Sequence, residues 1–465
     1  MSAEFTEWER LLELVSRLYF IENKPQTEIG SDQKVRATFA AAKGRRDRDS
    51  DKPLSQATIN RLLTEARQLG VTAVSVDVSF AVDLVPNVEV AKDLRNRFRL
   101  QSCSVLETAS KRQHPSQRDN SAGDPVAASD NDDRLILGLA NSTARDVVSA
   151  LAPGDHVTCG GGRTIWWLAR AIRRAPEANR SKKNLIFTPL SGRLWMEDWR
   201  TGDADIMERA LDADDAVHVL ADAFEHEPAR FSQINQPLYQ EDQAKAVEIC
   251  QTHCALGVDG TWNWECPNAS WAFVGVGWLG SPNHRLWIFL NRFEARERSA
   301  VESYLRVAGD DLLRIKQACA QADLPLPGDI ANRLFACLPM PDRVRAHNRE
   351  ELFDALASIA DDVEALNARA IVASWKHLRR TRRVTAIAGG RSKLAPLFTM
   401  LLSAFFDEQR SPSIGRGDAS PIITELSTDV ATARALLAAI HELQQDEALA
   451  VWYQRCAQRI GLSIP

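Results

Sequence analysis

The sequence lacks long apolar runs and a basic excess, and its first residues are unlike those of a secretory leader. No stretch of about 18 consecutive apolar residues occurs, so a membrane-spanning helix is not expected. The N-terminus, MSAEFTEWERLLEL, is acidic and amphipathic, whereas a secretory signal starts basic and continues apolar. The formal net charge is −5, so any contact with DNA must come from a local basic surface. We therefore expect a cytoplasmic protein with no membrane partner.

Cysteine is also sparse. Eight cysteines are spread over 465 residues, too thinly for a disulfide scaffold, and in a reducing compartment most would be small core residues. Cys250, His253, Cys254 and Cys266 form the pattern C-x2-H-C-x11-C, whose side chains could bind zinc. The CxxC pairs that usually mark zinc sites are missing. We therefore predict no metal and no cofactor, with zinc at this cluster as the weaker alternative.

Apolar residues at helical spacing mark the N-terminal region. They predict an amphipathic helix over residues 7–21 and a short helix over residues 27–30. A longer helix is expected over residues 54–70, with Ser55 as N-cap and Gly70 as C-cap. This is the helix-turn-helix plan, in which the start of the second helix enters the major groove of DNA. The side chains able to reach bases or phosphates are Ser55, Gln56, Thr58, Asn60 and Arg61.

Residues 31–53 separate these two helices and are locally basic. Seven Lys and Arg stand against four Asp, so the net charge is 7 − 4 = +3. Composition favours a solvated, disordered loop, and a wing that contacts DNA phosphates is the alternative. The basic residues are Lys34, Arg36, Lys43, Arg45, Arg46, Arg48 and Lys52.

Strand and helix patterns alternate through the rest of the chain. With 45% hydrophobic and 26% charged residues, the chain should divide into two or three domains. Residues 109–134 are polar and rich in Ser, Asp, Asn and Pro, so we expect a flexible linker there. Strands are expected at residues 71–78 and 102–107 and in NLIFTPLSG, SWAFVGVGWLG, RLWIFL and VTAIAGG. Helices are expected over residues 88–98, 135–151, 242–250 and 300–322.

This alternation predicts an α/β fold with a mostly parallel sheet. The ligands of such a sheet bind on the loops at the carboxyl ends of the strands. In this chain those loops are residues 159–164, 191–195, 275–279 and 389–393.

Residues 155–172, DHVTCGGGRTIWWLARAI, predict a strand, a tight glycine loop and a helix. Unpaired backbone N–H groups and the helix dipole would stabilise an anion there, and a glycine-rich turn without a ligand is the alternative. A dinucleotide fingerprint fits poorly because Ile165 replaces its third glycine, and no P-loop G-K-[ST] occurs. Trp166 and Trp167 point about 100° apart on a helix, so at most one can face a ligand.

Taken in order, the motifs resemble a known family. Residues 15–77 are similar to the N-terminal domain of the SorC/DeoR-type sugar-binding bacterial transcription regulators, although that family has only a few residues where this chain has 31–53. Seven further motifs follow in the order of the family's effector domain, which looks like a sugar-phosphate isomerase fold used for sensing. They are CGGGRT, PLSG, VGVGWL, GDIANRLF, LNARAIVASWKHLRR, AGGRSK and STDVATARALL.

The resemblance implies a division into three parts. Residues 1–80 would be an all-α helix-turn-helix domain with an insertion at 31–53, and residues 81–134 a connector with the polar linker. Residues 135–465 would be the α/β domain that binds the effector and forms oligomers. By resemblance, Asp329 would contact the hydroxyls of the effector and Lys393 would pair with the phosphate of the effector. The other residues implied to contact it are Gly160, Gly161, Gly162, Arg163, Thr164 and Ser191. After PLSG the family continues with glycine, whereas this chain has Arg193, Leu194 and Trp195, so the identity of the effector is not implied.

We therefore expect a transcription regulator, not an enzyme. It would bind operator DNA as a homodimer or homotetramer and change its affinity when a sugar or sugar phosphate binds. One alternative is a phosphosugar isomerase-like enzyme, although no compact acid–base constellation is visible in the sequence. Another is an interaction protein with a degenerate helix-turn-helix, because the 31–53 insertion separates helices whose packing sets the recognition angle.

Overall fold

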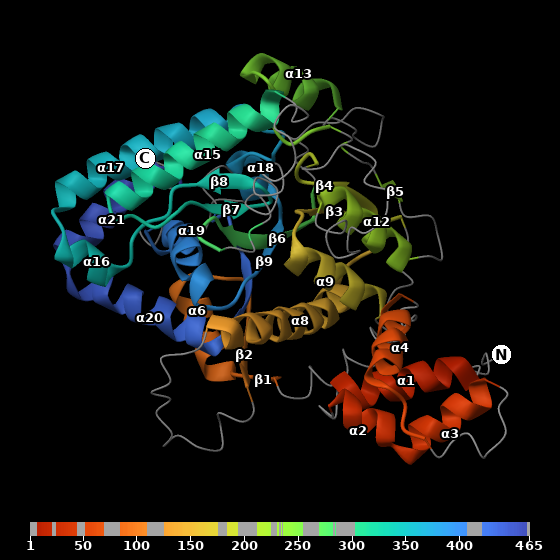
Figure 1. Ribbon diagram of the computed structural model, residues 1–465. Coiled ribbons are helices and arrows are strands. Elements are labelled where there is room, and N and C mark those ends of the chain that lie inside the picture. Colours follow the sequence, from red (N-terminus) through yellow and green to blue (C-terminus); the bar gives the residue numbers. More distant parts are fainter. Residues whose placement is uncertain are drawn as a thin grey trace. The chain divides into compact units, whose positions relative to one another are not determined.

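The computed structural model describes residues 7–20, 25–43, 52–68, 84–108, 125–174, 184–193, 212–224, 230–231, 234, 236–253, 269–281, 284, 303–406 and 421–462. The chain forms two compact units (Figure 1), called here the first and the second unit. The first takes in residues 1–85 and 108–118, and the second takes in residues 86–107 and 119–465. Residues 86–107, which we expected in the connector, thus belong to the second unit.

The first unit consists of helices around a small apolar core. Its helices are α1 (Glu7–Phe20), α2 (Gln26–Ser31), α3 (Gln33–Ala42) and α4 (Gln56–Gln68). The helices predicted over residues 7–21, 27–30 and 54–70 are confirmed, and the expected cap Gly70 lies outside the described residues. The core is made by Leu11, Leu12, Val15, Leu18, Ile29, Val35, Ile59, Leu62, Leu63 and Ala66.

Helix α3 corrects the prediction of a disordered loop over residues 31–53. The side chain of Asp32 accepts hydrogen bonds from the backbone N–H groups of Lys34 and Val35, which caps the helix. Val35 is fully buried in the core of the first unit, and Phe39 packs against that core. Charge composition concealed this helix because two or three apolar side chains are enough to anchor it. Residues 44–51 lie outside the described residues.

The second unit contains a sheet in the order β1-β2-β10-β9-β6-β3-β4-β5. All the pairs from β2 to β5 along this order are parallel, which confirms the predicted mostly parallel α/β fold. The strands β7 and β8 form an antiparallel hairpin on the end of β6. The bounds are β1 Leu84–Pro86, β2 Ser102–Thr108, β3 His156–Cys159, β4 Ile186–Pro189, β5 Arg230–Phe231, β6 Trp271–Trp278, β7 Gly328–Ile330, β8 Arg333–Phe335, β9 Arg383–Ile387 and β10 Glu425–Asp429.

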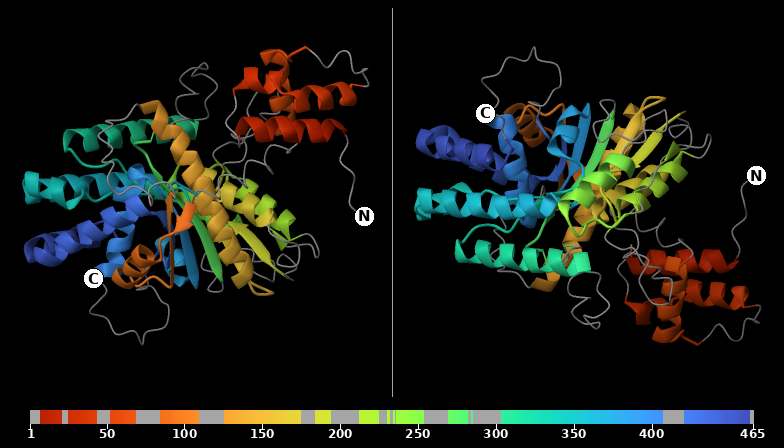
Figure 2. Two further views of the ribbon diagram at one scale, coloured as in Figure 1. Left: turned by 90° about the horizontal axis from the view of Figure 1, so that it is seen from below. Right: turned by 90° about the horizontal axis from the view of Figure 1, so that it is seen from above.

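Helices cover both faces of this sheet. On one face, a Cβ at Gly275 of β6 would contact Thr164 and Ile165 of α9. Trp278 of β6 faces the opposite side, and so does its strand partner Gly328, where a Cβ would meet Pro396 of α19. Figure 2 shows the blue and blue-green C-terminal helices gathered on one side of the sheet. The helices are α6 Val88–Arg97, α8 Pro125–Ala150, α9 Arg163–Arg173, α12 Ala213–Ala223, α13 Gln243–His253, α15 Ser303–Gln321, α16 Pro341–Ala346, α17 Arg349–Asn367, α18 Trp375–Arg380, the short 3-10 helix η3 Arg391–Lys393, α19 Leu394–Phe406, α20 Val430–Gln445 and α21 Glu447–Arg459.

Most of the expected elements of the second unit are present. The predicted helices over residues 88–98, 242–250 and 300–322 correspond to α6, α13 and α15. Helix α8 begins at Pro125, so the polar linker expected through residue 134 is shorter than predicted. The strands expected at residues 71–78 and in RLWIFL lie outside the described residues.

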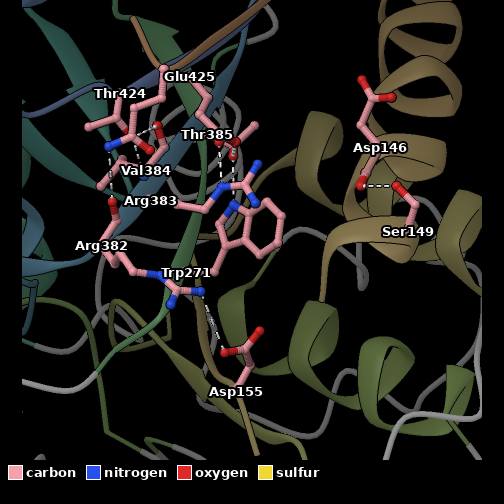
Figure 3. Close-up of polar contacts among 11 residues, drawn as sticks. Asp146, Ser149, Asp155, Trp271, Arg382, Arg383, Val384, Thr385, Thr424 and Glu425 are labelled. Atoms are coloured by element: carbon pink, nitrogen blue, oxygen red, sulfur yellow. Dashed lines mark hydrogen bonds and ion pairs between the residues drawn. The ribbon is translucent and has the colours of Figure 1, made fainter. Parts of the chain in front are cut away.

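A buried polar network joins three strands at their amino ends (Figure 3). Glu425 of β10 accepts hydrogen bonds from Arg383 Nε of β9, at 2.5 Å, and from Thr385 Oγ1, at 2.6 Å. Thr385 Oγ1 in turn accepts from Trp271 Nε1 of β6, at 2.7 Å. The guanidinium of Arg383 also lies 3.8 Å from the centre of the Trp271 ring, a cation–π contact. The network satisfies both carboxylate oxygens of Glu425 and ties β6, β9 and β10 together.

His156, the first residue of β3, predicts a pH dependence of stability. Burial, and then the charge of His377, lower the pKa of His156 from 6.5 to about 4. His156 therefore binds a proton more tightly in the unfolded chain than in the folded protein. As the pH falls from 6.5 to 4, this difference should lower the free energy of unfolding by about 3 kcal/mol, and above pH 6.5 it should have no effect. Urea unfolding at a series of pH values should show that His156→Gln, which cannot titrate, lacks this part of the acid loss. Parallel stability curves for the two proteins would contradict it.

Candidate functional site

Helix α4 is positioned by its cap and by the core of the first unit. Ser55 Oγ accepts a hydrogen bond from the backbone N–H of Thr58 and lies 2.9 Å from Thr58 Oγ1. This confirms Ser55 as the N-cap. Trp8 Nε1 of α1 donates to Glu65 Oε1 of α4, at 2.6 Å, which fixes the rotation of the helix. The hydroxyls of Ser55 and Thr58 are thus engaged with each other at the cap.

The outward face of α4 carries the remaining predicted DNA contacts. Gln56, Asn60 and Arg61 are exposed on this face, and Asn60 Oδ1 accepts a hydrogen bond from Gln26 Nε2 of α2, at 2.9 Å. Ala57 and Thr64 are exposed on the same face and were missed. Their spacing of three and four residues from Arg61 and Asn60 was the signal that could have found them.

Two glycine loops lie at the carboxyl ends of the strands that flank β6. Gly162 precedes α9 after strand β3, and Gly390 precedes η3 after strand β9. Gly162 has φ 106° and ψ 160°, and Gly390 has φ 91° and ψ 152°, a conformation essentially restricted to glycine. Neither glycine offers a side-chain cap to the turn that follows it, and the backbone N–H of Gly390 donates to Asp429 Oδ2, at 2.7 Å. The loops CGGGRT and AGGRSK are therefore neighbours across one strand.

Two glycines of β6 lie in the strand between these loops. Gly275 and Gly277 point to the same face of the sheet, the face covered by α9. A Cβ at Gly277 would lie 1.6 Å from Asp329 Oδ1, so the carboxylate of Asp329 occupies the space that a side chain would need. We expected residues 275–279 to be a ligand loop. They remain in the strand through Trp278 because β7 pairs with this end of β6.

Asp329 is held by the hairpin that carries it. Its Oδ1 lies 2.7 Å from His284 Nε2, and its Oδ2 accepts a hydrogen bond from the backbone N–H of Asn332, at 3.2 Å. Asp329 and His284 are both buried. A histidine paired with a carboxylate can perform acid–base chemistry, and the sequence reasoning missed it because residues 284 and 329 are distant in the chain. The expected contact between Asp329 and effector hydroxyls stays a prediction.

The β7–β8 turn brings further predicted residues together. Ala331 and Asn332 have φ values of 50° and 70°, as in the tight two-residue hairpin turn that normally uses Asn-Gly. Asn332 Nδ2 donates to Ser191 Oγ, at 2.7 Å, in the loop after β4. A Cβ at Gly160 would lie 3.0 Å from Ala331 Cβ. The turn therefore gathers the glycine loop after β3, the loop after β4 and Asp329.

Other predicted residues have separate surroundings. Arg163 and Thr164 open α9, and Lys393 ends η3 before α19, both at the carboxyl edge of the sheet. Arg193 Nε donates to Asp214 Oδ2 of α12, at 2.8 Å, so this cation is engaged with α12. Trp166 is buried, and its ring meets the half-buried Trp167 edge-on.

The possible zinc cluster lies partly outside the described residues. Cys254 and Cys266 lie outside the described residues, as do Leu194 and Trp195. Within the part of the chain that the structure describes, no group of three or more potential ligands could hold a metal ion. Among the helices in that part, none combines the length and apolar character needed to cross a membrane.

Comparisons with known proteins gave the following results. No family model matches the sequence, and no curated protein matches it. Among solved structures, the full-length sorbitol operon regulator SorC from Klebsiella pneumoniae is 15% identical, covering 93% of this chain and 100% of that chain, with a TM-score of 0.45. A DeoR family transcriptional regulator from Listeria monocytogenes is 16% identical, covering 75% and 98%, with a TM-score of 0.43. A transcriptional regulator from Streptococcus pneumoniae is 15% identical, covering 77% and 98%, with a TM-score of 0.43.

Proposed function

We propose that this protein is a cytoplasmic transcription regulator that binds operator DNA through α4 and is controlled by a sugar or sugar phosphate bound to the second unit. The observation that carries the proposal is the outward face of α4. A capped helix, fixed by Trp8 and by the core of the first unit, exposes Gln56, Asn60 and Arg61 together. Amide and guanidinium groups are the side chains that recognise adenine, guanine and phosphate in the major groove.

The carboxyl edge of the sheet supports the effector part of the proposal. The glycine-opened starts of α9 and η3 offer backbone donors for an anionic group, and Arg163 and Lys393 lie on these two turns. Between them, hydroxyl, amide, imidazole and carboxylate groups line one hairpin. Such a mixture of donors and acceptors suits a ligand with several hydroxyls. The effector residues are proposed to be Gly160, Gly161, Gly162, Arg163, Thr164, Ser191, Asp329 and Lys393.

Assembly follows from the way such helices bind DNA. One helix-turn-helix makes few contacts, and operators with two-fold symmetry are bound by paired domains. We therefore propose a homodimer or homotetramer.

The DNA-binding proposal predicts the effect of two substitutions. Gln56→Ala and Arg61→Ala should each weaken binding to the DNA upstream of the protein's own gene by about 1 to 3 kcal/mol, because each removes a contact with a base or phosphate. Fluorescence anisotropy of a labelled duplex measures the affinity. Lys92→Ala, which removes an exposed cation from α6, is the control and should leave the affinity unchanged. Equal affinities for all four proteins would place the DNA contact elsewhere.

The His284–Asp329 pair favours one other candidate, a phosphosugar isomerase-like enzyme on the same fold. Conversion of a sugar phosphate by the protein in the absence of DNA, followed by NMR, would favour that candidate over a regulator.

A further inference from the structure

Helix α8 directly contacts the loop that follows β9. A Cβ added at Gly389 would lie 3.0 Å from Leu139 Cδ1 and 3.1 Å from Leu135 Cδ2, so these leucines already fill the space beside the loop. The contact is closer than ordinary packing allows for a larger residue. A movement of residues 388–393 would therefore displace α8.

The same helix also packs along α9, whose first turn follows the other glycine loop. Both candidate anion loops thus meet α8, one through Gly389 and the other through α9. Helix α8 is also the first element of the second unit after residues 108–118, which belong to the first unit.

The side of α8 that faces the sheet changes character along its length. Leu135 and Leu139 are followed at helical spacing by Ser142, Thr143 and Asp146. Ser142 Oγ lies 3.5 Å from Ser104 Oγ of β2. Burial, and then the charge of Glu425, raise the pKa of Asp146, which is drawn on α8 in Figure 3. Ser142 thus meets a polar residue of β2, whereas Ala144, Val147 and Val148 in the same half of the helix are buried apolar residues.

Two hydroxyls of this interface are incompletely satisfied. Thr143 Oγ1 on α8 and Ser427 Oγ on β10 are buried and have no hydrogen-bond partner among the described residues. A buried hydroxyl without a partner contributes no hydrogen bond across the interface, so these two groups do not hold α8 in place.

We propose that α8 is the coupling helix, which is displaced when the loop over residues 388–393 moves and so transmits effector binding to the first unit. The inference rests on the proposed function, since it assumes that the first unit binds DNA and the second binds the effector. Leu135 and Leu139 are its positioning residues. They touch the loop and act through the helix.

A substitution that pushes α8 tests this without an identified effector. Gly389→Ala inserts a methyl against Leu139, and Leu139→Ala in the same chain makes room for it. Hydrogen exchange of the full-length protein by mass spectrometry should show exchange over residues 125–150 rising about tenfold in Gly389→Ala, and operator affinity should change about tenfold. The double variant should return most of the way to wild type. The methyl also approaches Asp429, and Leu139→Ala leaves that approach unchanged, so only transmission through α8 is suppressed.

Ala448→Val is the control, because it adds methyl groups to an exposed side chain in the first turn of α21. The inference is overturned if exchange in α8 is unchanged, or if α8 responds while operator affinity does not. It is also overturned if Leu139→Ala fails to suppress the effect. If the wild type binds no duplex, the proposed function fails, and hydrogen exchange in α4 then decides whether α8 reports to the first unit.

If Gly389→Ala does not fold, a second pair of variants gives the same decision. Leu139→Ala and Val148→Ala both remove buried aliphatic atoms from α8, but only Leu139 touches Gly389. Exchange in α4 and operator affinity should change in the first and not in the second. Equal behaviour of the two would overturn the inference.

Discussion

Gly30→Ala is expected to lower operator affinity by about two orders of magnitude, because every contact made by α4 is displaced together. Gly30 lies in α2, and a Cβ there would be only 2.3 Å from the backbone oxygen of Leu54, just before the cap of α4. The two segments are also joined by a hydrogen bond, in which the N–H of Leu54 donates to the backbone oxygen of Gly30 at 2.9 Å. A backbone carbonyl cannot rotate away as a side chain would. The approach of α4 to α2 therefore depends on the missing side chain.

The same substitution should lower the free energy of unfolding of the first unit by about 3 to 4 kcal/mol, from overpacking and from the lost hydrogen bond. Anisotropy with the operator duplex measures the first effect, and hydrogen exchange over residues 7–68 measures the second. Ala37→Val, an exposed enlargement on α3, is the control and should change stability by less than about 0.5 kcal/mol. Wild-type affinity in Gly30→Ala would mean that the distance between α2 and Leu54 does not set the position of α4.

Glu425→Ala should destabilise the second unit by about 3 to 5 kcal/mol. Removing the carboxylate leaves Arg383 and Thr385 without their shared acceptor, and Thr385 in turn accepts the hydrogen bond of Trp271 at the amino ends of three strands. The side chain of Glu425 is only 6% exposed, so water cannot replace it fully. The ion pair between Arg383 and Glu425 is expected to matter because its loss leaves the guanidinium of Arg383 without its partner in a largely desolvated site.

Glu350→Ala is the natural control for that experiment. Glu350 pairs with Arg455 on the surface of the second unit, with its side chain 66% exposed, so its loss should cost at most about 1 kcal/mol. Urea unfolding followed by circular dichroism compares the two variants. If both lose the same small amount, the network of Figure 3 makes no special contribution to the sheet.

Periodic and capped segments were predictable from the sequence for a physical reason. The apolar stripes of α1 and α4 each match one helical face, and Ser55 has a capping hydroxyl placed before Thr58. Helix α3 was missed because the charged residues of the whole segment 31–53 outweighed the few apolar residues that anchor the helix. The glycine loops after β3 and β9 were located correctly, since glycine directly after a strand is a local signal.

The assembly of the candidate site was less accessible. The β7–β8 strands are three residues each, and their turn uses Ala331 and Asn332 without the usual glycine. Nothing in the local sequence pairs His284 with Asp329 or Asn332 with Ser191, because these contacts arise only when the hairpin is added to β6. Long-range pairing of this kind is a property of topology and not of any window of residues.

The position of β2 has a consequence for how this protein can be divided and recombined. Residues 102–106 pair in register with β10, although they precede the polar linker and are far from β10 in sequence. A gene fusion or exchange that took only residues 135–465 would leave one side of β10 without its partner and present a bare strand edge, the surface on which proteins aggregate. The second unit is therefore not one contiguous stretch of the sequence. A functional exchange of this unit must include the strand that precedes the linker.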